Sequence, residues 1–454
     1  MKNFKHPMRH KNVFLTFIIV FVFAAILNSC SDNVVNNSTN NNISPQTSTY
    51  DGTYAMEWEM VLYNIIANES RYNPPKASRI YCYSCITIYE SVVNGMPYNR
   101  SLSGQLNEMP SMPRPESSVE YDWPSVITGS MPVVIKTLLN TNYNSSLNMI
   151  NNLHNRQAAE RKALKDSNIV NRSLSYGESI ANKILEWSQT DHYAETRHMT
   201  YVPPPRSLNP ANWEPINPGD TAEEPYWGTL RTFSLPNSGY DEVSPSFLFD
   251  TLPSSPFYRD ELEIKTIKEN LTTEQYNIAM YWRDKQLTGT PPGHWINIIC
   301  QMQTKFNMKL DKAAEIFALG GIAVADAFIS AWHTKYKYNY LRPQSYIRDY
   351  IDPNFLPLIP TPPFPDYPSG HSTSSGSVSY VLTQILGQVA FVDTTHNRLG
   401  MPGRPFNSFY EAADECSNSR VYGCIHYRNA CENGVLMGRK IGQTIMERVK
   451  LKIF

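Results

Sequence analysis

Apolar residues recur along most of the chain at the three- and four-residue spacing that places them on one face of a helix. This pattern predicts eleven helices, at residues 54–66, 77–94, 133–139, 145–167, 173–188, 273–284, 295–308, 309–341, 372–386, 406–420 and 426–451. No segment shows the apolar–polar alternation that a series of strands would require. The sequence therefore predicts an all-α fold built from packed helical bundles.

The helical pattern is interrupted between residues 200 and 256, where proline is frequent and Trp213, Tyr226, Trp227 and Phe233 recur. We expect a long ordered loop at this place. Loops of this length without regular structure often serve function, so a lid or a cavity wall is one interpretation. A packed excursion over the surface is the other.

Residues 1–29 have the composition of a signal peptide, with basic and no acidic residues before an apolar run at 13–27 that is too short to span a bilayer. The sequence Leu-Asn-Ser-Cys that ends at Cys30 resembles a bacterial lipobox, in which cleavage precedes a cysteine that is then lipidated. We expect an extracytoplasmic protein anchored by a lipid on Cys30, with an Asn/Ser-rich tether at 30–50. An ordinary secretory signal and a single anchor helix are the alternatives.

Residues 51–454 contain no second segment that resembles the tether, so we expect them to form one large domain. We expect no segment after residue 30 to be long and apolar enough to cross a membrane. Removal of residues 1–29 takes four basic residues from the 40 Lys and Arg of the chain and none of its 41 Asp and Glu, which leaves a formal charge of −5. This excess of negative charge disfavours nucleic acid as a partner.

The stretch 362–371, Pro-Pro-Phe-Pro-Asp-Tyr-Pro-Ser-Gly-His, combines a rigid extended lead-in with the start of a helix. Such a junction exposes backbone N–H groups at the positive end of the helix dipole. Ser369 adds a hydroxyl there, and His371 adds an imidazole. We interpret the junction as the floor of an anion site; a Pro-rich loop with a serine N-cap is the alternative.

Two cations stand before this stretch. Lys335 and Arg342 are seven residues apart, about two helical turns, so a continuous helix that ends at Pro343 would present both on one face. Two converging cations would suit a multiply charged anion. A solvated basic stripe that includes Lys337 and Arg348 is the alternative.

An arginine and a histidine follow it. Arg420 and His426 are six residues apart, and on one continuous helix they would point in directions about 120° apart. A break near Gly423, with His426 opening a new helix, would let both side chains enter one pocket.

The three segments Lys-x6-Arg-Pro, Pro-Ser-Gly-His and Ser-Arg-x5-His occur in this order within residues 290–450. Together they resemble the superfamily of vanadium-dependent haloperoxidases and type 2 phosphatidic acid phosphatases. The whole Pro-Pro-Phe-Pro-Asp-Tyr-Pro-Ser-Gly-His stretch, the helical body and the long N-terminal half are most similar to the haloperoxidase branch of bacterial lipoproteins.

The resemblance implies a vanadate cofactor, or phosphate in the same site, held by Lys335, Arg342, Ser369, Gly370 and Arg420. His426 would be the single protein ligand to vanadium, and His371 would take a proton from peroxide. Catalysis would thus depend on Lys335, His371 and His426. The implied activity is oxidation of halide by hydrogen peroxide to hypohalous acid, with iodide or bromide favoured and small organic molecules as acceptors.

One position departs from the superfamily. Many members carry Asp four residues after the ligand histidine, where this chain has Ala430. That Asp would orient the imidazole, so its role must be absent here or fall to a backbone carbonyl, Asn429 or Glu432.

Two other functions compete with the haloperoxidase. An acid phosphatase of the same superfamily would use His426 as the nucleophile that forms a phosphohistidine, with His371 protonating the leaving group. A surface-tethered binding lipoprotein would explain the tether and the aromatic content, but it gives no reason for three cations and two histidines in this order.

Overall fold

The computed structural model describes residues 43–454 with the exception of 218, 286 and 454. The predicted signal peptide and the first part of the tether lie outside the described residues. Residues 43–50, the last part of the predicted tether, pack onto the fold: the Ser44 hydroxyl accepts from the N–H of Tyr121, and the indole of Trp123 donates to the carbonyl of Pro45.

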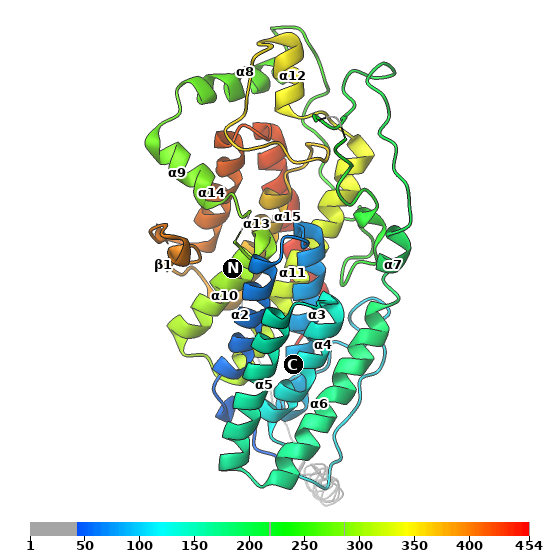
Figure 1. Cartoon of the computed structure of the whole chain (residues 1–454), viewed down its shortest axis with the longest axis vertical. Helices are drawn as coiled ribbons and strands as arrows, with labels where there is room; N and C mark the ends of the chain where they lie inside the picture. Colours follow the sequence, from blue (N-terminus) through cyan, green and yellow to red (C-terminus); the bar gives the residue numbers. More distant parts are fainter. Residues whose placement is uncertain (1–42, 218, 286, 454) are drawn as a thin grey trace, which may run out of the picture. The chain divides into compact units, whose positions relative to one another are not determined.

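The described residues form the all-α fold that the hydrophobic pattern predicts (Figure 1). The helices are α2 (Thr53–Asn68), α3 (Pro74–Val92), α4 (Trp123–Leu139), α5 (Asn144–Leu164), α6 (Ser167–Ser188), α7 (Tyr193–Thr196), α8 (Pro256–Glu269), α9 (Thr273–Tyr281), α10 (Thr290–Phe306), α11 (Leu310–Tyr338), α12 (Pro343–Tyr350), α13 (Gly370–Leu386), α14 (Phe409–Tyr422) and α15 (Arg428–Arg448). Two short antiparallel strands, β1 (Phe391–Asp393) and β2 (Arg404–Phe406), pair with Phe391 opposite Phe406.

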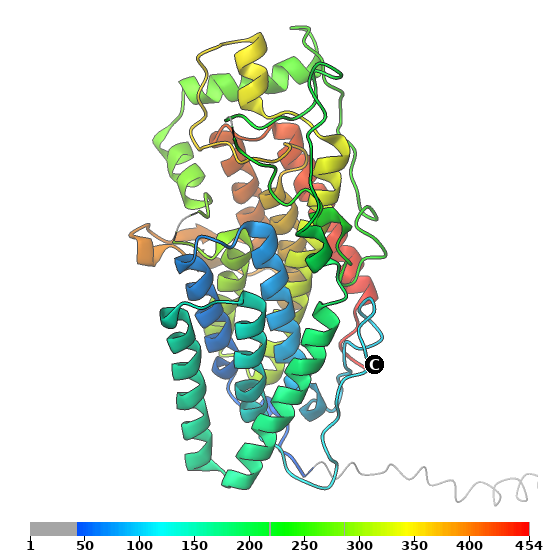
Figure 2. The same cartoon turned by 45° about the vertical axis from the view of Figure 1, so that its right-hand side comes forward.

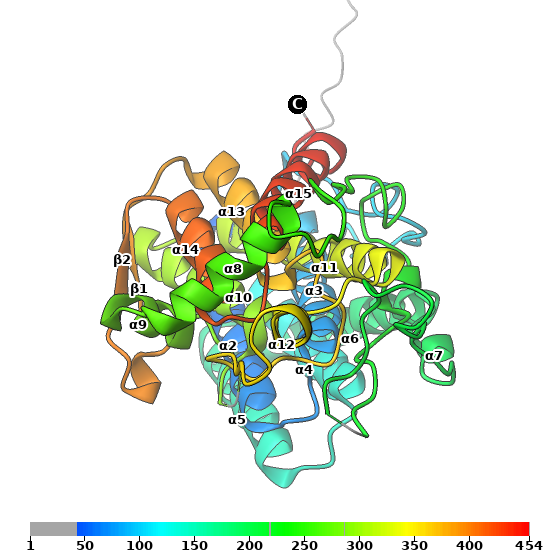
Figure 3. The same ribbon diagram turned by 90° about the horizontal axis from the view of Figure 1, so that it is seen from above.

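Helix α11 lies between two groups of helices (Figures 1 and 3). It packs against α3, which in turn packs against α4, and α4 pairs with α6. It also packs against α13, which pairs with α14 and α15. Contrary to our expectation, α11 is long and apolar enough to cross a membrane, but its apolar window is 100% buried inside the fold, so core packing explains its composition.

The long loop between residues 200 and 256 packs along α11 (Figure 2). The buried carboxylate of Asp326 in α11 accepts hydrogen bonds from the backbone N–H groups of Phe233, Ser234 and Leu235 and from the Ser234 hydroxyl. Earlier in the loop, the N–H of Glu223 donates to the carbonyl of Pro363. The loop therefore forms a fixed wall over α11 and the Pro-rich stretch.

A buried cluster of charged groups ties the turn before α10 to the β1–β2 hairpin. Nδ1 of His294 lies 2.8 Å from Oδ1 of Asp284, and its Nε2 lies 2.7 Å from Oδ2 of Asp393. Nε2 of His396 lies 3.0 Å from the same oxygen of Asp284. These ligand types would suit a metal ion. Both nitrogens of His294 are already engaged by carboxylates, however, so we assign the cluster to charge pairing.

Electrostatics supports this assignment. Burial alone would lower the pKa of His294, but the two carboxylates outweigh it and raise the pKa to about 10. Burial also opposes ionisation of Asp284 and Asp393, yet the cationic His294 holds the pKa of both below its usual range. His294 is therefore a charged imidazolium held between two carboxylates at neutral pH.

The pairing of His294 with Asp284 and Asp393 predicts that the free energy of unfolding depends on pH. The pKa of His294 is about 6.5 in the unfolded chain and about 10 in the fold. The contribution of charged His294 to the free energy of unfolding is therefore complete below pH ~6.5 and is lost as the pH rises toward 10. We expect His294→Gln to lower the free energy of unfolding by about 3–5 kcal/mol at pH 6, and by clearly less at pH 10, in urea titrations. His154→Gln, at a partly buried histidine of α5, is the control. A deficit that stays constant from pH 6 to 10 would contradict the imidazolium.

Candidate functional site

The two cations that precede the Pro-rich stretch come together in a way that differs from our prediction. Helix α11 ends at Tyr338, and Asn339 follows it in the left-handed conformation with φ 50°. Arg342 is the N-cap of α12, and Pro343 begins that helix instead of ending α11. Lys335 and Arg342 therefore meet across a turn and not on one helix face. Proline suits the first turn of a helix because its missing N–H has no partner there.

Both side chains are held by backbone carbonyls of the stretch 364–366. Nζ of Lys335 donates to the carbonyls of Pro365 and Asp366 at 3.0 and 2.8 Å. Nε of Arg342 donates to the carbonyl of Phe364 at 2.7 Å. The ring of Phe364 lies against both cations, 5.0 Å from Nζ of Lys335 and 4.6 Å from Cζ of Arg342. The extended stretch 364–366 therefore holds two cations in place and packs an aromatic ring against them.

The junction after the lead-in has the predicted form. Ser369 is the N-cap of α13, and its hydroxyl accepts from the N–H of Ser372 at 3.3 Å. Gly370 is the first helical residue, where a Cβ atom would lie 3.0 Å from the ring of Trp332. Glycine therefore allows the start of α13 to approach α11 closely. The positive end of the α13 dipole lies at Ser369 and Gly370.

The predicted break between Arg420 and His426 is also present. Helix α14 ends at Tyr422 and α15 begins at Arg428, with Cys424 between them at φ +59°. His426 lies in this junction, two residues before α15, and does not itself open the helix. Its Nε2 lies 3.1 Å from Nη1 of Arg342, so the break brings the third segment against the first.

The charges of the predicted site residues act on one another. Burial lowers the pKa of His426 well below its usual value, and Arg342, Lys335, Arg420 and His371 lower it further. Lys335, Arg342, Arg420 and His426 are at most 2% exposed. His371 keeps partial exposure, but its Nε2 is buried without a hydrogen-bond partner. Both histidines are therefore neutral, with a nitrogen lone pair available.

The positive charges of the three cations are not fully compensated by negative groups. Burial lowers the pKa of Lys335 well below its usual value and that of Arg420 in the same direction, and it lowers the pKa of Arg342 to about 10. Nη2 of Arg342 is buried and has no hydrogen-bond partner. An oxyanion would supply the missing negative charge and acceptors, so the residues present fit vanadate or phosphate.

Sequence reasoning missed one residue of the site. The carboxylate of Asp366 is fully buried, with Oδ1 at 2.8 Å from Nδ1 of His426 and 3.8 Å from Nη1 of Arg342. Burial raises its pKa to about 7, against the opposing effect of Arg342 and Lys335. Its sequence signal was an acidic residue inside an otherwise apolar, proline-rich lead-in.

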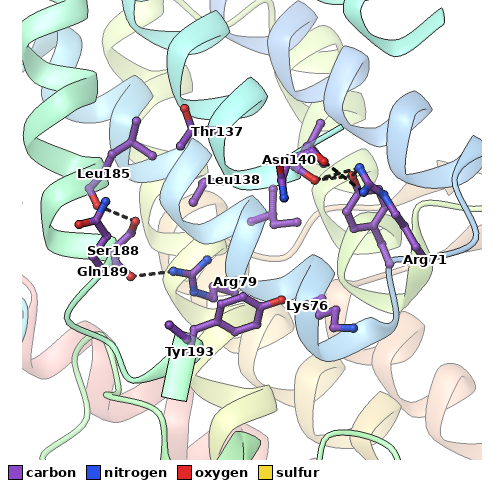
Figure 4. A pocket seen from close by; sticks show the side chains of 14 residues that line it. Arg71, Lys76, Arg79, Thr137, Leu138, Asn140, Leu185, Ser188, Gln189 and Tyr193 are labelled. Carbon is purple, nitrogen blue, oxygen red and sulfur yellow. Dashed lines mark hydrogen bonds between the residues drawn. The ribbon is translucent and has the colours of Figure 1, made fainter. Parts of the chain in front are cut away.

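A separate cavity of about 440 Å³ lies among α3, α4 and α6 (Figure 4). Three cations line it, but each is paired: Arg71 with Glu69 at 2.9 Å, Lys76 with Glu224 at 3.1 Å and Arg79 with Asp191 at 2.6 Å. None of the predicted site residues lines this cavity. Its cations are compensated, so it lacks the charge excess that distinguishes the cluster around His426.

This chain is similar to known proteins. The family model of the VCPO second helical-bundle domain matches residues 315–453. The vanadium chloroperoxidase of Curvularia inaequalis is 34% identical over 126 residues, which cover 22% of this chain and 21% of that protein, about a fifth of its length.

Solved structures match over far more of the chain. The crystal structure of the first bacterial vanadium-dependent iodoperoxidase has a TM-score of 0.82 and 30% identity, and the match covers 89% of this chain and 97% of that one. A holo-type bacterial vanadium-dependent chloroperoxidase has a TM-score of 0.64 at 15% identity over 85% of this chain and 95% of that one, which shows a shared fold. With the site residues in place on this fold, the chain belongs to the vanadium-dependent haloperoxidase family.

Proposed function

We propose that this protein is a vanadate-dependent haloperoxidase that oxidises iodide or bromide with hydrogen peroxide. The reaction consumes one halide, one peroxide and one proton and yields hypohalous acid and water. The observation that carries the proposal is the buried group of Lys335, Arg342 and Arg420 around a neutral imidazole of His426. Three cations beside a single carboxylate, that of Asp366, keep an excess of positive charge that would bind a multiply charged oxyanion, and a neutral imidazole would coordinate its central atom.

Each group has a defined part in holding the cofactor. Lys335, Arg342 and Arg420 would neutralise the oxygens of vanadate, while Ser369 and the N–H of Gly370 would add hydrogen bonds at the positive end of α13. Nε2 of His426 would be the ligand to the metal, because its Nδ1 faces Asp366. Bound vanadate supplies a Lewis acid that polarises peroxide while its own oxidation state stays unchanged.

His371 is suited to move the proton. Burial and the charge of Arg420 lower the pKa of its imidazole well below the usual value, so it is neutral and its Nε2 can accept a proton from hydrogen peroxide. The imidazolium formed in this step can return that proton to the leaving water. Phe364 and Trp332 place aromatic rings 5.0 and 5.7 Å from Nζ of Lys335, and they would keep bulk water from the reacting oxygens.

Two considerations support iodide or bromide over chloride as the halide. Iodide is the easiest of the three to oxidise, so a modestly activated peroxide would suffice. The structure with a TM-score of 0.82 to this chain is that of an iodoperoxidase. Small organic molecules that react with hypohalous acid would be the final halogen acceptors.

We expect His426→Ala to lower peroxide-dependent iodide oxidation at least ~100-fold, because it removes the metal ligand. Chelator-treated protein is reconstituted with vanadate, and oxidation of iodide, bromide and chloride is assayed beside phosphomonoester hydrolysis. His198→Ala, at an exposed histidine, is the control and should retain full activity.

The same assay separates the competing functions. Unchanged iodide oxidation in His426→Ala would exclude the mechanism. Phosphatase activity alone in the wild type would indicate the acid phosphatase, and neither activity would indicate the binding lipoprotein.

We expect His371→Ala to lower kcat about 10²- to 10⁴-fold, because the peroxide loses its proton acceptor. Vanadate affinity, measured by equilibrium dialysis with inorganic vanadate, should fall much less than in His426→Ala, because His371 is not the ligand. If both variants lose vanadate to the same degree, His371 is a binding residue and not the acid–base group.

We further propose that the protein is exported and held at the membrane only by a lipid on Cys30. The support is the lipobox-like sequence that ends at Cys30 after the apolar run at 13–27. Expressed in a bacterial host with labelled palmitate, the wild type should carry label and partition into detergent, and Cys30→Ser should do neither. A labelled Cys30→Ser protein would contradict the anchor.

A further inference from the structure

The position at which many relatives carry an orienting Asp does not serve that role in this chain. Ala430 is fully buried in an apolar cluster with Leu341, Tyr367 and Tyr427. Its carbonyl accepts from the N–H of Ser369 at 3.0 Å and is therefore engaged in holding α13.

The acceptors that we expected to replace it do not face the imidazole. The side-chain oxygen of Asn429 accepts from the N–H of Ser246 at 3.3 Å. Glu432 is exposed. Nδ1 of His426 must therefore find its acceptor elsewhere than on α15.

Asp366 lies where such an acceptor is needed, but it precedes His426 in the sequence instead of following it. Its Oδ1 lies 2.8 Å from Nδ1 of His426, and neither oxygen of the carboxylate has another hydrogen-bond partner. The backbone on both sides of the carboxylate is fixed, because the N–H of Asp366 donates to Tyr340 and its carbonyl accepts from Lys335.

We propose that Asp366 is the positioning residue of the metal ligand: it accepts from Nδ1–H of His426 and thereby keeps Nε2 unprotonated and aimed at the oxyanion. This inference rests on the proposed function. Nη1 of Arg342 lies 3.1 Å from Nε2 and 3.5 Å from Nδ1 of His426, so Arg342 alone does not decide which nitrogen carries the proton. Free imidazole can place its proton on either nitrogen, and only the form with a free Nε2 can bind the metal on the side of the cations.

The position of Asp366 explains how one carboxylate can serve this purpose without cancelling the anion site. It lies at 3.8 Å from Arg342, on the Nδ1 side of the imidazole, while the unpartnered Nη2 of Arg342 stays available. One carboxylate on this side does not cancel the charges of Lys335, Arg342 and Arg420, which all act on the imidazole of His426. The lead-in thus supplies both the carbonyls that hold two cations and the carboxylate that orients the ligand.

The test compares Asp366→Ala, Asp366→Leu and Asp366→Asn with the wild type in the full chain. We expect the dissociation constant for inorganic vanadate, measured by equilibrium dialysis, to rise about 10- to 100-fold in the Ala and Leu variants. Leu fills the space without an acceptor, so it serves if the cavity left by Ala prevents folding. Asn keeps an acceptor oxygen and should show a smaller rise. Asp414→Asn is the control, because Asp414 pairs with Arg439 and should leave vanadate affinity unchanged.

A second readout does not depend on vanadate. Nitrogen-15 NMR of vanadate-free protein should show His426 protonated on Nδ1 in the wild type and in Asp366→Asn, and protonated on Nε2 in Asp366→Leu. A folded Leu variant that keeps the Nδ1 proton, or that binds vanadate as tightly as the wild type, would overturn the proposal. A wild type that binds no vanadate would instead refute the proposed function, and the tautomer alone would then decide the role of Asp366.

Discussion

The burial of three cations in one small space is the constraint on which the rest of this structure depends. Removing charges from water is costly, and like charges at short range add repulsion to that cost. Neutral acceptors reduce this cost. Lys335 and Arg342 donate to four backbone carbonyls, those of Phe364, Pro365, Asp366 and Ile425. Carbonyl dipoles lower the cost without removing the positive charge, so the site keeps its affinity for an oxyanion.

This constraint also accounts for the architecture around the site. Carbonyls can converge on two cations only where the chain is extended and forms no helical bonds of its own, and the prolines between 362 and 368 enforce this. The extended stretch must then be held from outside. Glu223 of the long loop donates to Pro363, and the loop itself is bound through three N–H groups to Asp326 of α11. The loop is therefore part of the support of the site and not a separate excursion.

Much of the fold follows from hydrophobic periodicity because most helices bury one broad apolar face. The predictions failed where that signal is weak. In α8 only Phe257, Glu261 and Ile264 are buried, and α12 has eight residues, so neither produces a clear pattern. The first half of α4 was missed because nearly all of its residues are buried, which removes the polar face that marks a helix. The β1–β2 pair has three residues in each strand, too few to show alternation.

The site could be predicted to the level of which segments meet, but not how they meet. Motif order and the break near Gly423 indicated convergence of Arg420 and His426, since glycine and a helix end leave local marks. The prediction that Pro343 ends α11 was wrong, because proline can end one helix or begin the next and only packing decides between them. The place of Asp366 in the site was not predicted, because its contact with His426 joins residues sixty positions apart. No local pattern records such a contact.

The charge constraint finally explains why one scaffold suits two chemistries, and what favours one of them here. Vanadate and phosphate have the same shape and similar charge, so three cations and a helix N-terminus bind both. A neutral Nε2 serves equally as a ligand to a metal or as a nucleophile toward phosphorus. A phosphate ester, however, also brings an alcohol group that must fit beside the anion. In this chain the cations are covered by Phe364 and Trp332, and Trp332 is fixed through its indole N–H to the carbonyl of Glu223. Under the proposed function, aromatic walls at this place would favour small reactants such as peroxide and halide over a bulky ester.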